Sequence, residues 1–299
     1  MYNLRNYFFL LKYKNLNLLT KHTTTLSKNF NTSFEEGHSH QDMSKKENIV
    51  KDWLPRYTGR KLEDFGEFIL LTNFIGYVEK FAERFGVEVE GRNKPMQTAT
   101  ADNITIINFG MGSAMAATVM DLLSAIDIQA LLFLGKCGGL KKKNELGSFV
   151  LPIAAIRGEG TSNDYLPSEV PALPSFRIHK SASIIIRNHQ LDYYTGTVYT
   201  TNRRVWEHDS SFKKYLEDMR VMAIDMETAT IFTVGFVNEI PRGALLMVSD
   251  NPMIPEGVKT SKSDSAVSAQ FAERHLQVGI ETLQRIAKSG KSMKHMRFE

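Results

Sequence analysis

The chain has 299 residues, of which 42% are hydrophobic and 10% aromatic, which is enough to form a sizeable core. Its formal net charge is only +4, which argues against a protein built to coat nucleic acid. The single cysteine, Cys137, excludes an intramolecular disulfide and a cysteine-cluster metal site, and it is typical of a reducing compartment.

The N-terminal 42 residues differ in composition from the rest. Residues 1–34 contain five bases and no acid, and their apolar run at 7–11 is shorter than a signal-peptide core of ~7–15 residues or a membrane span of ~20. We expect 1–42 to be an N-terminal extension outside the fold, disordered or not native. It is either an organellar transit segment or sequence translated upstream of a start at Met43, and poor amphipathicity with few arginines favours the second. Residues 43–299 are expected to form a single domain, cytoplasmic unless the extension is a transit segment.

The predicted elements begin with a helix. Apolar residues recur with helical spacing over 63–85, which predicts one core-facing helix, and a polar stretch follows at 91–102. Short apolar runs then predict buried strands at 103–109, 129–134, 149–156, 195–199, 221–224 and 243–248. Helical patterns lie at 113–126, 181–189, 226–238 and 265–288. This alternation predicts an α/β fold, a three-layer α/β/α sandwich with a central mixed, mostly parallel sheet.

Sheets of this kind bind ligands at the carboxyl ends of their strands. After the strand 103–109, glycines would let a ligand approach the backbone, and a helix N-terminus would offer its amides to an anion. This segment is not the dinucleotide-binding fingerprint, because Met115 stands where the third glycine belongs. The candidate ligand contacts in these two connections are Gly110, Gly112, Ser113 and, after the next strand, Lys136.

Carboxylates follow two further predicted strands. Asp225 and Glu227 come after 221–224, where Asp225 could cap the next helix and Glu227 could complement its dipole. Alternatively, Glu227 would accept hydrogen bonds from sugar hydroxyls while Met226 packs against the sugar. Asp250 follows 243–248 and is either a turn residue or a catalytic acid.

Four ordered blocks together resemble the nucleoside phosphorylase and nucleosidase superfamily, whose members cut or exchange the N-glycosidic bond of nucleosides. The blocks are Phe-Leu-Gly-Lys-Cys-Gly-Gly-Leu (133–140), Gly-Thr-Val-Tyr-Thr-Thr-Asn-Arg-Arg-Val-Trp-Glu (196–207), Ala-Ile-Asp-Met-Glu-Thr-Ala-Thr (223–230) and Val-Ser-Asp-Asn-Pro (248–252). Within the superfamily they look most similar to the AMP nucleosidases, in a short form without the extra N-terminal domain. The resemblance covers about 53–298 and implies hydrolysis of AMP to adenine and ribose 5-phosphate. No cofactor is expected, and the eight histidines show no metal-ligand spacing.

The resemblance also implies roles for single residues. Glu227 would hold the ribose 2′ and 3′ hydroxyls with Met226 against the sugar, and Asp250 would protonate or hydrogen-bond adenine N7. A protonated base leaves as a neutral molecule from an oxocarbenium-like transition state. Asp250 therefore needs a pKa raised by burial, whereas Glu227 is expected to stay ionised.

One position departs from the phosphorylases of the superfamily. They carry an arginine for the attacking phosphate two residues before Gly135, where this chain has Phe133, so hydrolysis by water fits better. The remaining candidates are cations for a 5′-phosphate and an aromatic ring that could stack on adenine: Lys136, Arg203, Arg204 and Trp206. The alternatives are a solvated arginine pair on a loop and a tryptophan that anchors the core.

Two other functions stay open at this point. A purine nucleoside phosphorylase is one, which Phe133 argues against, and a catalytically silent nucleotide-binding regulatory protein is the other. The expected partner is AMP as a small-molecule substrate, with no nucleic acid and no membrane. The superfamily further implies a dimer-based homo-oligomer, such as a hexamer.

Overall fold

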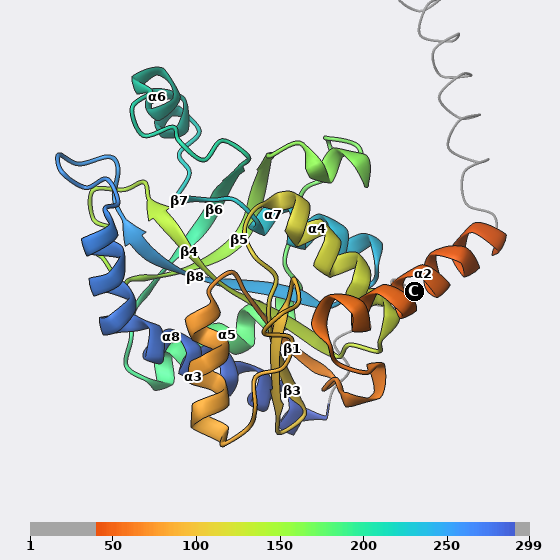
Figure 1. Ribbon diagram of the computed structural model, residues 1–299. Coiled ribbons are helices and arrows are strands. Elements are labelled where there is room, and N and C mark those ends of the chain that lie inside the picture. Colours follow the sequence, from red (N-terminus) through yellow and green to blue (C-terminus); the bar gives the residue numbers. More distant parts are fainter. Residues whose placement is uncertain (1–39, 291–299) are drawn as a thin grey trace, which may run out of the picture. The chain divides into compact units, whose positions relative to one another are not determined.

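The computed structural model describes residues 40–290 (Figure 1). Most of the expected N-terminal extension, residues 1–39, lies outside the described residues, so that expectation stays a prediction. The chain divides into two units between Ile49 and Val50, within helix α2 (His40–Thr58). The second unit, from Val50, carries the whole sheet.

Within the described residues, eight strands form one mixed sheet in the order β2-β3-β1-β4-β7-β6-β5-β8, and β8 also pairs with β4. The strands are β1 (Phe68–Thr72), β2 (Gln97–Ala101), β3 (Ile104–Asn108), β4 (Ala130–Gly139), β5 (Phe149–Gly158), β6 (Tyr193–Thr201), β7 (Ala223–Asp225) and β8 (Arg242–Asp250). Five pairings are parallel, and the β2–β3, β4–β7 and β5–β8 pairings are antiparallel. The predicted α/β fold with a mixed sheet is confirmed.

The double pairing of β8 changes the shape of the sheet. Strands β4, β7, β6, β5 and β8 form a closed ring, because β8 pairs with both β5 and β4. This half of the sheet is therefore not the flat middle layer that a three-layer sandwich implies.

Helices cover the sheet through two apolar clusters. Side chains of α3 (Ile75–Phe85), α5 (Phe176–Asn188) and α8 (Ser261–Ser289) belong to one cluster, and those of α4 (Ser113–Leu122) and α7 (Thr228–Val237) to the other. Alternate residues of β1 enter the two clusters, as the two-residue period of a strand requires. The remaining helices are α6 (Ser210–Asp218) and the 3-10 turns η1 (Leu62–Asp64), η2 (Leu123–Ala125) and η3 (Thr161–Asp164).

The single helix predicted over 63–85 is wrong. The segment forms η1, strand β1 and helix α3. All five residues of β1 are buried, and the strand lies between β3 and β4, so this run has no polar side to turn toward solvent. A short, mostly apolar run that is buried along its whole length is typical of a central strand, whereas an amphipathic helix keeps a polar side exposed.

The later predictions agree better with the structure. The strands expected from residue 103 onward correspond to β3–β8, and the four helices to α4, α5, α7 and α8, with ends shifted by several residues. Strand β2 and helix α6 were not predicted. Strand β4 also continues through the glycine-rich 135–139, because glycine permits close packing there. A Cβ at Gly135 would lie 2.5 Å from the Phe133 ring.

Candidate active site

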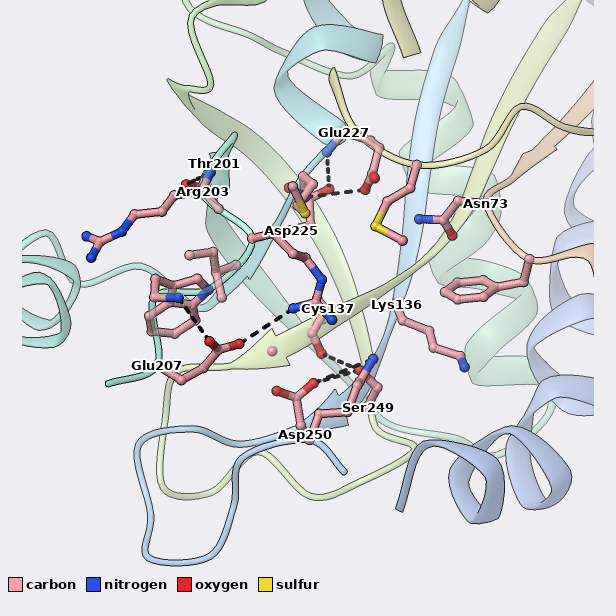
Figure 2. A pocket seen from close by; sticks show the side chains of 18 residues that line it. Asn73, Lys136, Cys137, Thr201, Arg203, Glu207, Asp225, Glu227, Ser249 and Asp250 are labelled. Atoms are coloured by element: carbon pink, nitrogen blue, oxygen red, sulfur yellow. Dashed lines mark hydrogen bonds and ion pairs between the residues drawn. The ribbon is translucent and has the colours of Figure 1, made fainter. Parts of the chain in front are cut away.

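A pocket lies where β4, β6, β7 and β8 end (Figure 2). Its lining residues are Asn73, Phe74, Met111, Lys136, Cys137, Gly138, Thr201, Arg203, Arg204, Trp206, Glu207, Ile224, Asp225, Met226, Glu227, Ser249, Asp250 and Lys259. Seven of the ten predicted site residues are among them, and Gly110, Gly112 and Ser113 are not. Figure 2 shows Glu227 and Asp250 on opposite sides of Cys137, facing the same space.

Glu227 lies in the turn from β7 to α7 and is only 2% exposed. Its Oε1 accepts the backbone N–H of Gly112 at 2.8 Å, and its Oε2 accepts that of Met226 at 3.3 Å. The side chain of Asn73, just after β1, also acts on this carboxylate and lowers its pKa. Backbone groups from two separate segments therefore fix the position of this carboxylate.

The glycines before α4 support Glu227 and do not line the pocket. Gly110 and Gly112 have φ of +85° and +91°, a region that favours glycine. The N–H of Gly110 donates to Asn108, and that of Gly112 donates to Glu227. The Ser113 hydroxyl donates to the carbonyl oxygen of Met226 at 2.6 Å. Protein acceptors therefore use the amides of Gly110 and Gly112, and binding of an anion by this segment stays a prediction.

Asp225 has the geometry of a structural cap. Its Oδ2 accepts the N–H of Thr228 at 2.8 Å, and its Oδ1 accepts the hydroxyl of Thr200 at 2.7 Å. These bonds satisfy donors at the start of α7 and tie that helix to β6.

The pKa values of these two neighbouring carboxyls are both raised. Burial is the largest cause for each, and the charge of Asp225 raises the pKa of Glu227 further, to about 7. Burial therefore opposes the ionised form expected for Glu227, and that expectation stays a prediction. The sequence motif indicates two carboxylates but not that both are buried.

Asp250 ends strand β8 and is 9% exposed. Burial raises the pKa of its carboxyl, while a hydrogen bond from the Ser249 hydroxyl (2.8 Å) and the Lys259 ammonium 3.9 Å away act in the opposite direction. The net direction is upward, as required of a carboxylic acid that holds a proton for a leaving group.

The four cations of the pocket differ in their contacts. Lys136 is buried, with its Nζ 4.2 Å from the centre of the Phe74 ring. Arg203 donates to Asp209 at 2.8 Å, and Figure 2 shows it directed away from Lys136 and Asp250. The other two cations each lie near a carboxylate of the pocket, Arg204 at 3.7 Å from Glu207 and Lys259 at 3.9 Å from Asp250.

Trp206 packs in the core and also lines the pocket. Its ring is 5% exposed and packs edge-on against Phe212, with centroids 5.6 Å apart. The same residue lines the pocket. It is therefore an anchor of the α6 region that also borders the space available to a ligand.

Phe133 does not reach the pocket. It is fully buried, and its ring lies 5.8 Å from that of Phe109 in the core. The position at which the resemblance implies a phosphate-binding arginine in phosphorylases is thus an apolar core position in this chain.

Several lining residues were not predicted as site residues. Asn73 and Phe74 follow β1, and the helical pattern over 63–85 gives no sign of a strand end at this position. Glu207 and Ser249 adjoin the predicted Trp206 and Asp250, and this adjacency was the available signal.

Two features are absent from the described residues. No group of three His, Cys, Asp or Glu side chains there is placed to hold a metal ion. In the same part of the chain, no helix has the length and apolar character needed to cross a membrane.

Comparisons with known proteins identify the family of this chain. Residues 67–285 match the phosphorylase superfamily. The AMP nucleosidase of Escherichia coli (strain K12) is 29% identical over 285 residues, covering 79% of this chain, and the chain spans 58% of the length of that protein.

Solved structures are also similar. The crystal structure of AMP nucleosidase from Bacteroides thetaiotaomicron is 55% identical, with a TM-score of 0.74 over 82% of this chain and 98% of that one. A uridine phosphorylase from Vibrio fischeri, 22% identical with a TM-score of 0.67 over 75% and 93%, shares the fold. This chain belongs to the phosphorylase superfamily and is a homologue of the AMP nucleosidases within it.

Proposed function

We propose that this protein hydrolyses the N-glycosidic bond of AMP, giving adenine and ribose 5-phosphate. The observation that carries the proposal is the joint placement of Glu227 and Asp250, both buried, on opposite sides of one pocket. Homology to AMP nucleosidases supports the choice of substrate. The match to one solved AMP nucleosidase covers 98% of that chain.

Asp250 is the proposed acid at the base. In its protonated form it gives a proton to adenine N7 as the bond from C1′ to N9 breaks, so that adenine leaves neutral. Burial, which raises the pKa of Asp250, favours the form that can donate.

Glu227 and Met226 are the proposed ribose contacts. The carboxylate would accept hydrogen bonds from the 2′ and 3′ hydroxyls, and these donors favour its ionised form against the effect of burial. Once ionised, it also stabilises the positive charge that develops on the ribose.

The cations at the pocket are the proposed 5′-phosphate ligands, and Trp206 is proposed to stack on adenine. Among Lys136, Arg203 and Arg204, the contacts support Lys136 and Arg204 more than Arg203, whose guanidinium is held by Asp209. A bound phosphate orients the ribose and contributes binding energy away from the reacting bond.

The deciding experiment incubates the protein with AMP or adenosine, with and without inorganic phosphate, and identifies the products by chromatography. Adenine and ribose 5-phosphate from AMP without added phosphate are expected. Phosphate-dependent formation of a sugar 1-phosphate would instead identify a phosphorylase, which the core position of Phe133 disfavours. Tight AMP binding without any product would identify a regulatory nucleotide-binding protein. A cytoplasmic, dimer-based homo-oligomer stays a prediction.

A further inference from the structure

Lys259 lies beside the proposed acid and favours its ionised form. Its Nζ lies 3.9 Å from Asp250 Oδ1, and both side chains are largely buried, at 24% and 11% exposed. A cation at this distance favours the ionised carboxylate. An ionised Asp250 cannot give a proton to a leaving base, so the ion pair opposes the proposed reaction.

The other groups near Asp250 belong to three elements. They are the Ser249 hydroxyl, the Cys137 thiol, the Glu207 carboxylate and the Arg204 guanidinium. Burial raises the pKa of Cys137, so this thiol carries no charge at neutral pH. Glu207 and Arg204 have opposite effects on the pKa of Asp250 and lie 3.7 Å from each other. Lys259 is therefore the cation whose displacement would change the charge of Asp250 most directly.

Lys259 is also well placed to change partners. It stands in the connection between β8 and α8, and its ammonium is a point charge on a flexible four-carbon stem. In a purine nucleotide with the base anti, the N7 edge and the 5′-phosphate lie on the same side of the sugar. An acid at N7 and a lysine beside it are thus both near the phosphate, whose double negative charge competes with a single carboxylate.

We propose that Lys259 leaves Asp250 for the 5′-phosphate of bound AMP, and that this exchange allows Asp250 to take up its catalytic proton. The inference rests on the proposed function and adds a reason for nucleotide specificity. Adenosine would occupy the same pocket but leave the ion pair intact. The phosphate would therefore act on turnover as well as on binding.

Asp250 takes one proton from solvent when Lys259 leaves, and it passes this proton to N7 while the C1′–N9 electron pair goes to adenine. Water adds its oxygen to C1′ and releases one proton to solvent. The sum is AMP and water giving adenine and ribose 5-phosphate. The Asp250 carboxylate can then pair with Lys259 again.

The first test compares kcat against pH for AMP and adenosine. Loss of activity at high pH reports deprotonation of the acid in the enzyme–substrate complex. In the wild type, we expect this loss of activity to occur about one pH unit higher with AMP than with adenosine. In Lys259→Met, the loss of activity should occur at the same pH with both substrates. The ratio of kcat for AMP to kcat for adenosine should fall at least about tenfold. Lys259→Arg should keep the wild-type difference.

Lys213→Met is the matched control. Lys213 donates to the carbonyl oxygen of Pro252 at 2.7 Å and so supports the same connection, without a place in the pocket lining. Its pH profiles should remain those of the wild type. Loss of activity at the same pH with AMP and adenosine in the wild type, or an equal loss with both substrates in Lys259→Met, would overturn the proposal.

A measurement without turnover separates this inference from the proposed function. Calorimetric titration with ribose 5-phosphate or ribose, in two buffers of different ionisation enthalpy, counts the protons taken up on binding. We expect ribose 5-phosphate to cause an uptake in the wild type that is absent in Lys259→Met and Asp250→Asn. The same uptake in all three proteins would refute the exchange. Uptake without AMP hydrolysis would refute only the proposed function.

Discussion

The two sides of the pocket hold a buried carboxylate by different means. On the β7–α7 side, backbone N–H groups of Gly112 and Met226 bind Glu227, and these cannot move without moving their segments. On the β8 side, side chains contact Asp250, one of them the long Lys259. A carboxylate held by backbone keeps a constant geometry and suits binding. One whose charge depends on a flexible cation can change protonation during a reaction.

Replacing Asp250 is expected to have the largest effect. Asp250→Asn keeps the size of the side chain but has no proton to give, so kcat for AMP should fall about 10²–10⁴-fold. The dissociation constant for AMP should stay within about threefold, as measured by equilibrium binding. Ser249→Ala is the control, because it removes one hydrogen bond to the carboxylate and should reduce kcat less than about tenfold. Wild-type turnover in Asp250→Asn would exclude it as the acid.

Replacing Glu227 tests the other side of the pocket. Hydrogen bonds to a charged group contribute about 1.5–3 kcal/mol, so Glu227→Gln should lower kcat/KM for AMP about 10–100-fold. The loss should be much smaller with 2′-deoxy-AMP, which lacks one of the two hydroxyls that Glu227 is proposed to bind. An equal loss with both substrates in steady-state assays would contradict a ribose contact.

The same variant gives a prediction about stability. Folding raises the pKa of Glu227 from 4.5 to about 7, so between these values the folded protein binds more protons than the unfolded chain. The free energy of unfolding contributed by this group therefore falls as pH rises through that window and is constant above it. Between pH 5 and 7, we therefore expect the Tm of Glu227→Gln to fall less than the Tm of the wild type. Each 1 kcal/mol of difference corresponds to about 2–4 °C in Tm. Parallel Tm curves would show that the carboxyl is not buried as described.

The smallest effect is expected at Arg203. Its guanidinium is 43% exposed and pairs with Asp209, and such exposed pairs contribute about 0–1 kcal/mol. Arg203→Met should change Tm by less than about 3 °C and KM for AMP by less than about threefold. A much larger rise in KM would support Arg203 as a ligand of the 5′-phosphate and would place the phosphate on the β6–α6 side of the pocket.

Local pattern was sufficient for much of the fold. From residue 103 onward, apolar runs correspond to β3–β8 and helical periodicity to four helices. The pattern is informative there because each helix buries one face and each short strand is largely apolar. The same rule failed at Phe68–Thr72, where burial on both faces of a central strand mimics a helical stripe. The second pairing of β8 has no local signal, since it joins segments about a hundred residues apart.

The sequence by itself determined the residue types at the strand ends, and through four ordered blocks it indicated the superfamily. Only the tertiary structure decided which groups meet. It directs the N–H of Gly112 to Glu227, 115 positions away, and brings the side chain of Asn73 to the same carboxylate. It also buries Asp225 and Glu227 together and places Lys259 beside Asp250. Protonation depends on burial and on nearby charges, which come from segments far apart in the chain, so the state of each carboxyl follows from the fold and not from the motif.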